Sequence, residues 1–168
     1  MTPVSHVRHT SCVSRSIVGS EVRVIGIGNP GRGDDGVGPA VASEVASRVE
    51  SAIDVLVSTA DPSRLIERWG AADTVILVDA VVDAEEPGTV SVFDAATQPL
   101  PADCESVSSH GMGVAAAVEL ARSLGRLPEH LIVVGVTGSD FEGDGLTSSV
   151  ESAVPRAVEA VMEVVAHA

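Results

Sequence analysis

The strongest candidates for chemistry are three metal-binding side chains that lie far apart in the sequence: Asp35, Asp79 and His110. Two carboxylates and one imidazole suit a first-row divalent metal ion, and such a set leaves coordination positions open for a substrate. If His110 begins a helix, the helix dipole disfavours imidazolium, so the ring stays neutral and able to bind a metal. Residue types and spacing alone leave another interpretation open, in which Asp35 caps a helix, Asp79 ends a strand and His110 lies in a loop.

The first candidate lies in the glycine-rich stretch VRVIGIGNPGRGDDGVG, residues 22–38. Its apolar start predicts a strand, and valines at helical spacing predict a helix over about 39–50. Glycine at this density lets the intervening loop approach a ligand or a neighbouring element closely. In an open α/β sheet, ligands bind beyond the carboxyl ends of the strands, where this loop holds Asp34 and Asp35. Asp34 is interpreted as a simple loop residue, in preference to one that orients a ligand.

Strand and helix patterns alternate along the rest of the chain. Strands are expected over 53–58, 74–82, 89–93 and 130–136, and helices over 62–70, 108–124 and 147–166. The third strand is continuously apolar except for Asp79, which we place at its end, and such a run is typical of a strand buried on both faces. The fourth strand alternates and is expected nearer an edge. The order favours a three-layer α/β/α fold with a mainly parallel twisted sheet of about five strands, of phosphorylase/hydrolase-like type.

Polar and glycine residues mark the expected helix ends. Asp61 is the expected N-cap of the second predicted helix, and Gly70 its end. Ser108 or Ser109 is expected to cap the third helix, which Gly125 closes.

Composition limits the classes of function. We expect a single domain over residues 21–168, preceded by a disordered N-terminal extension over residues 1–20 that lacks the apolar centre of a secretory signal. The chain carries 24 acidic and 10 basic residues, a net charge of −14, which disfavours nucleic acid and anionic membranes as partners. Two cysteines are too few for a disulfide framework, and no apolar run is long enough to span a membrane. The expected location is cytoplasmic.

Other catalytic and binding motifs are weak or absent. The string GIGNPG (26–31) matches the dinucleotide pattern GxGxxG, but Asp34 and Asp35 would meet a pyrophosphate with like charge. The sequence has neither a P-loop nor a GxSxG motif. Ser108 and Ser109 are adjacent to His110 in sequence, which is not the geometry of a serine–histidine pair.

Four ordered motifs resemble those of the hydrogenase maturation proteases, the endopeptidases that trim the C-terminus of the [NiFe]-hydrogenase large subunit. The motifs are GIGNPGRGDDGVG, ILVDAV (76–81), SSHGMG (108–113) and GLTSSVESAVPRAVEAV (145–161). The resemblance spans about residues 22–165. It implies that Asp35, Asp79 and His110 are the metal-binding and catalytic residues.

The resemblance also implies the substrate and the role of the metal. The partner would be the precursor of a [NiFe]-hydrogenase large subunit, and the nickel already inserted in that precursor would be the recognition element. Nickel would therefore be supplied by the substrate, and other divalent metals are expected to substitute in vitro. The ion or a carboxylate would activate water or polarise the scissile carbonyl, and the sequence does not choose between these roles.

Two rival functions belong to other classes. Peptidyl-tRNA hydrolases also begin with a strand and a loop of the pattern GxGNPG. This chain, however, lacks the tyrosine expected in that family, since it has no tyrosine at all, and its net negative charge disfavours tRNA binding. A non-catalytic module that binds a hydrogenase or a metal chaperone is the second alternative.

Overall fold

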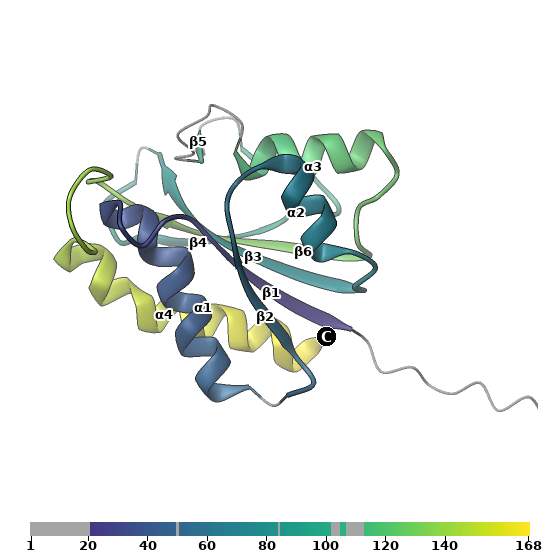
Figure 1. Cartoon of the computed structure of the whole chain (residues 1–168), viewed down its shortest axis with the longest axis horizontal. Coiled ribbons are helices and arrows are strands. Elements are labelled where there is room, and N and C mark those ends of the chain that lie inside the picture. Colours follow the sequence, from purple (N-terminus) through teal and green to yellow (C-terminus); the bar gives the residue numbers. More distant parts are fainter. Residues whose placement is uncertain (1–20, 50, 84, 102–104, 107–112) are drawn as a thin grey trace, which may run out of the picture.

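A computed structural model describes residues 21–49, 51–83, 85–101, 105–106 and 113–168, in which the chain forms one sheet with helices on both faces (Figure 1). The strands are β1 (Val22–Ile27), β2 (Asp54–Ser58), β3 (Thr74–Val82), β4 (Val90–Asp94), β5 (Glu105–Ser106) and β6 (His130–Thr137). The helices are α1 (Val37–Arg48), α2 (Pro62–Trp69), α3 (Val114–Ser123) and α4 (Ser148–His167), with a short 3-10 helix, η1 (Gly33–Gly36), before α1. The predicted extension over residues 1–20 lies outside the described residues.

The sheet is mainly parallel, as predicted. Its order is β2-β1-β3-β6-β4, and β1, β2, β3 and β6 run parallel to one another. β4 is antiparallel to β6 and forms one edge, which confirms the expected edge position. The two-residue β5 pairs antiparallel with the end of β3 and was not predicted. β2 forms the opposite edge of the sheet.

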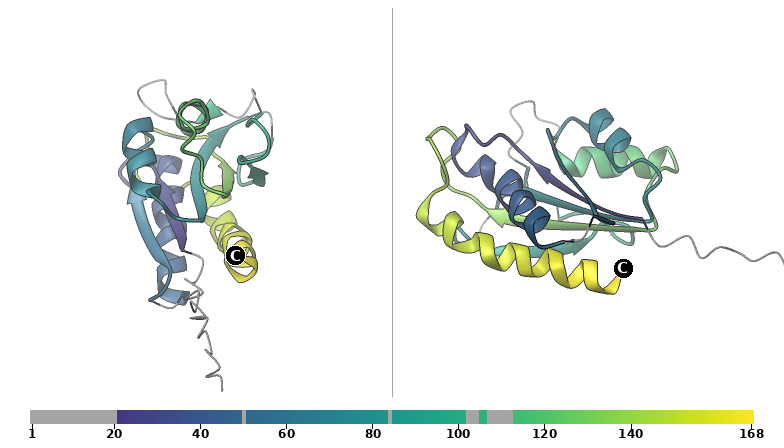
Figure 2. Two further views of the ribbon diagram at one scale, coloured as in Figure 1. Left: turned by 90° about the vertical axis from the view of Figure 1, so that its right-hand side faces the viewer. Right: turned by 60° about the horizontal axis from the view of Figure 1, so that its bottom comes forward.

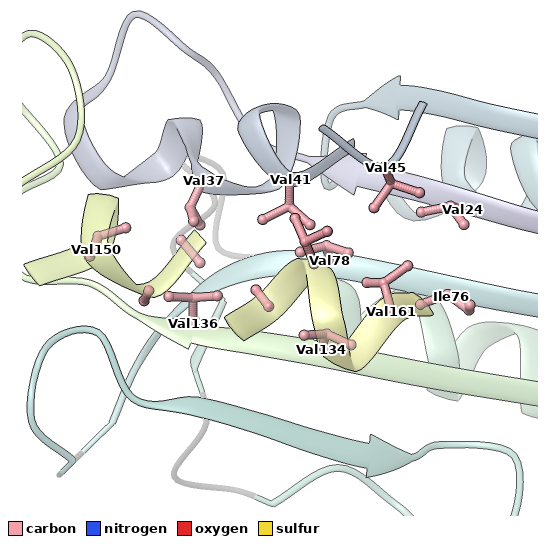
Figure 3. Packing of buried hydrophobic residues seen from close by; sticks show 14 of the residues in the cluster. Val24, Val37, Val41, Val45, Ile76, Val78, Val134, Val136, Val150 and Val161 are labelled. Atoms are coloured by element: carbon pink, nitrogen blue, oxygen red, sulfur yellow. The ribbon is translucent and has the colours of Figure 1, made fainter. Parts of the chain in front are cut away.

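Two apolar cores lie on opposite faces of the sheet. Helices α1 and α4 cover one face, and α2 and α3 cover the other (Figure 2). Figure 3 shows the first core, where Val41 of α1 and Val161 of α4 pack with Val78 of β3. Neighbouring residues on β3 alternate between the cores, so that Leu77 joins α2 and α3 while Val78 joins α1 and α4. β3 is therefore buried on both faces, as its apolar sequence predicts.

The helix ends follow local chemistry with one correction. Asp61 caps α2 as predicted, because its Oδ1 accepts the backbone N–H of Arg64 at 2.9 Å, and Gly70 ends the helix. Helix α3 begins later than expected, at Val114, and its N-cap is Gly113. Ser108 or Ser109 as N-cap was therefore wrong, because a cap directly precedes the first helical turn. Both serines lie outside the described residues.

In the part of the chain that the structure describes, no helix is long and apolar enough to cross a membrane.

Candidate active site

The glycine-rich loop folds back onto the end of β1 and brings its two aspartates there. The backbone of Gly28 has φ of +130°, and its N–H donates to the carbonyl of Ser58 at the end of β2. A Cβ on Gly28 would overlap the backbone carbonyl of Asp35, so only glycine permits this approach. A Cβ on Gly38 would likewise meet the carbonyl oxygen of Val78 at 2.5 Å. The start of α1 is therefore pressed against the ends of β1 and β3.

Asp35 lies in η1, with its side chain buried at the carboxyl end of β1. The residue is 7% exposed, and its Oδ2 accepts the backbone N–H of Asn29 at 3.0 Å. Burial raises the pKa of the Asp35 carboxyl, and the Asn29 N–H and the Arg32 guanidinium only partly oppose this rise. A carboxyl with a raised pKa and a fixed orientation suits proton exchange during catalysis.

Asp79 lies inside β3, although the sequence placed it at the end of the strand. β3 continues to Val82 and pairs Asp79 with Gly135 of β6. The pairing between β3 and β1 ends at Val78, so Asp79 is the first β3 residue beyond that ladder. Its side chain, in a residue only 2% exposed, alternates with that of Val78 and so faces the side covered by α2 and α3. β3 has the predicted bounds, 74–82, and its last residues pair with β5 and β6.

Asp34 has a structural role that the sequence analysis missed. The residue is completely buried, and its carboxylate accepts the backbone N–H groups of Ser139, Asp140 and Thr147 at 2.8, 3.1 and 2.7 Å. The Thr147 hydroxyl donates a fourth bond at 3.1 Å. Burial alone would raise the pKa of Asp34, but these hydrogen bonds outweigh it and lower the pKa. The interpretation of Asp34 as a simple loop residue was wrong. No local signal in the sequence indicates this role, because the hydrogen-bond partners of Asp34 lie more than 100 residues away.

The two carboxylates of the predicted trio therefore lie at the carboxyl end of the β1–β3 ladder. Asp35 follows β1, Asp79 follows the β1–β3 ladder, and η1 contacts β3. His110, the third member, lies outside the described residues. Within the described residues, no group of three or more His, Cys, Asp or Glu side chains is arranged to hold a metal ion. The convergence of all three residues stays a prediction.

Comparison with known proteins identifies the family. The chain matches the family HycI, hydrogenase maturation protease, over residues 39–164. It is 27% identical over 151 residues to hydrogenase expression/formation protein HupD of Thiocapsa roseopersicina, covering 88% of this chain and 68% of that protein. Among solved structures it is similar to the hydrogenase maturating endopeptidase HybD of E. coli, with a TM-score of 0.74 and 23% identity over 88% of this chain and 93% of that one.

A second solved structure, the [NiFe] hydrogenase maturation protease HybD of Thermococcus kodakarensis, has a TM-score of 0.70 and 25% identity, covering 86% of this chain and 98% of that one. The likeness to both structures confirms the α/β fold. The family match covers most of the chain and includes all of β3 and most of α1 and α4. The chain belongs to the hydrogenase maturation protease family and is a maturation endopeptidase.

Proposed function

We propose that this endopeptidase removes a C-terminal peptide from the nickel-loaded precursor of a [NiFe]-hydrogenase large subunit, and that the nickel held by the precursor is its recognition element. The observation that carries the proposal is the placement of two buried aspartates at the carboxyl end of the β1–β3 ladder: Asp35 follows β1, and Asp79 is the first β3 residue beyond its pairing with β1. Two buried carboxylates at the same end of the β1–β3 ladder supply oxygen ligands of the kind that divalent cations bind, which favours a cation-dependent site.

The donor set fits a substrate-supplied metal. Asp35 and Asp79 offer oxygen, and His110 is proposed to offer an imidazole nitrogen. The described residues on either side of His110 support this. Ser106 belongs to β5, which pairs with β3 beyond Asp79, and Gly113 caps α3, which covers the face toward which the Asp79 side chain points.

Weak binding of free nickel by the enzyme is part of the proposal. Carboxylate and imidazole ligands hold nickel less tightly than a set that includes thiolates, so the precursor would retain the ion and the enzyme would complete its coordination. Metal insertion then acts as a checkpoint, because an empty precursor shares no bridging ion with the protease. Bound in this way, the ion would supply Lewis acidity at the scissile carbonyl.

Peptide hydrolysis also needs proton transfer from the attacking water and to the leaving nitrogen. Asp35 suits such a role because its pKa is raised by burial and its Oδ2 is held by Asn29. Asp79 is fixed by the β3 backbone and would position substrate from the neighbouring strand.

The test is processing of a nickel-loaded precursor by a His110→Ala variant. We expect cleavage to fall by at least about 100-fold while the protein stays folded, because a lost ligand removes both recognition and orientation. His130→Ala is the matched control, since His130 is an exposed histidine at the amino end of β6. Full processing by a folded His110→Ala variant would refute the proposed trio.

A further inference from the structure

A pocket of about 580 Å³ lies at the carboxyl end of β2, and of its lining residues only Gly28 and Ser58 take part in the site described above. Its lining comes from Gly28 after β1, from Val57 to Thr59 at the end of β2, and from Arg64, Glu67 and Arg68 on α2. We propose that this pocket and the outer edge of β2 bind the precursor segment on the C-terminal side of the scissile bond, as an extended strand that carries carboxylates. This inference rests on the proposed function and assigns a place to the peptide that is released.

The outer edge of β2 is able to accept an extended chain. Within the described residues, β2 is the terminal strand of the sheet and pairs only with β1. The Ser58 carbonyl accepts from Gly28, so the backbone groups of Ser58 point inward and those of its neighbour Val57 point outward, because the direction alternates along a strand. Val57 is also 50% exposed. A peptide strand added here would pair with Val57, which is a common mode of peptide recognition.

The charge of the pocket sets the chemistry of the peptide. Arg64 and Arg68 lie one helical turn apart on α2 and are both exposed. Among the described residues neither guanidinium lies within 4.0 Å of a carboxylate, whereas Arg23, Arg48 and Arg122 form ion pairs. The single acidic side chain of the lining, Glu67, leaves the pocket with a net positive charge on a protein of net charge −14. Such a local reversal favours a carboxylate-bearing partner.

The pocket adjoins the candidate active site at Gly28. Gly28 lines the pocket, and the same residue packs against the backbone of Asp35. A peptide that lies along Val57 and Ser58 would therefore reach the carboxyl end of β1, where Asp35 is located. A segment released from the end of a precursor always terminates in a free carboxylate, so at least one negative charge is available to Arg64 or Arg68.

The proposal is tested by NMR titration of the ¹⁵N-labelled full-length protein, without metal or precursor. The probe is an acetylated octapeptide of alternating valine and threonine, with glutamate at its last two polar positions and a free carboxyl terminus. We expect saturable shifts of the backbone amide signals of Val57 and Gly28. A matched peptide with glutamine at both positions and an amidated terminus is expected to bind roughly tenfold more weakly.

Charge reversal at Arg64 and Arg68 tests whether these two arginines bind the carboxylates of the peptide. The double variant Arg64→Glu and Arg68→Glu is expected to bind the glutamate peptide at least roughly tenfold more weakly, with the rest of its amide spectrum unchanged. Arg126→Glu makes the same kind of charge change on an exposed arginine without an ion pair among the described residues, and it should bind within about twofold of wild type.

Three results would each overturn the proposal: no shift at Val57 with millimolar glutamate peptide, equal binding of both peptides, or equal weakening by Arg126→Glu. Because the titration needs neither nickel nor cleavage, its failure is distinguishable from failure of the proposed function. Loss of processing in His110→Ala leaves the titration unchanged, and a negative titration leaves the processing result unchanged.

Discussion

The carboxylate of Asp34 accepts two hydrogen bonds from Thr147, one from its backbone N–H at 2.7 Å and one from its hydroxyl at 3.1 Å. Thr147 is the N-cap of α4, so this contact joins the loop after β1 to the start of the last helix. The loop also donates a hydrogen bond to the segment before α4, since the backbone N–H of Asp34 donates to the Asp140 carbonyl at 2.7 Å. Asp35, the next residue, is thereby held between a fixed loop and the end of β1.

Removal of the Asp34 carboxylate should destabilise the protein. Asp34→Ala leaves three partly buried backbone N–H donors without their acceptor, and we expect a loss of about 3 kcal/mol in the free energy of unfolding. Urea denaturation measures this loss of stability. Asp144→Asn, at an exposed position of the same loop, is the control and should change stability by less than about 0.5 kcal/mol. Equal stability of the two variants would contradict the anchoring role.

The same carboxylate predicts a dependence of stability on pH. Because the pKa of Asp34 is lowered in the folded state, its stabilising contribution is fully present above the ordinary aspartate pKa and is lost as pH falls through the folded-state pKa. The stability advantage of wild type over Asp34→Asn should therefore be constant between about pH 5 and 7 and should shrink below about pH 4. Urea denaturation across this range measures the advantage, and one that stays constant down to about pH 2 would refute the assignment.

The contribution of Asp35 to stability should depend on pH with the opposite sign. Burial raises its pKa, so ionised Asp35 costs stability in the folded state at neutral pH, and this cost disappears as pH falls below the ordinary aspartate pKa. Asp35→Asn keeps an acceptor for the Asn29 N–H and should be as stable as wild type or up to about 1 kcal/mol more stable at pH 7.

Precursor cleavage by the same variant should nevertheless fall by at least about 100-fold, because an amide neither exchanges a proton nor binds a cation as a carboxylate does. Thermal denaturation and the processing assay together check this pair of outcomes. A destabilised but active variant would contradict both parts.

Gly28→Ala tests the close approach between the loop and Asp35. The new Cβ would overlap the Asp35 carbonyl at a backbone φ of +130°, so we expect a loss of more than about 3 kcal/mol together with loss of cleavage. Gly125→Ala is the matched control, since Gly125 also has positive φ but no described residue lies within 4 Å of its Cβ position. Its expected cost is only about 1–2 kcal/mol, with cleavage retained. Similar losses in both variants would show that steric overlap at Gly28 is unimportant.

The fold was predictable where local pattern and tertiary packing agree. Continuous apolar runs gave β1, β3 and β6 because these parallel strands are buried on both faces. Asp61 and Gly70 marked the ends of α2 because capping is a local interaction. The two-residue strand β5 carries no periodic pattern, and its pairing with β3 is long-range, so sequence inspection missed it.

The site was predictable in part. The sequence drew attention to Asp35 and Asp79 as carboxylates next to apolar strands, and both residues are buried, while their role in catalysis stays a prediction. The role of Asp34 was not foreseen, because its hydrogen-bond partners lie more than 100 residues away, as in its 105-residue separation from Ser139. Arg64 and Arg68 likewise became notable only when the sheet order placed β2 at an edge beside them.

The central claim is that nickel bound to the precursor gates cleavage at Asp35, Asp79 and His110. The most direct measurement is cleavage of one large-subunit precursor prepared with and without nickel, by wild-type enzyme under otherwise identical conditions. We predict release of the C-terminal peptide from the nickel-loaded precursor alone, and no release from it by Asp79→Asn. Equal cleavage of the nickel-free precursor by wild-type enzyme would contradict the claim.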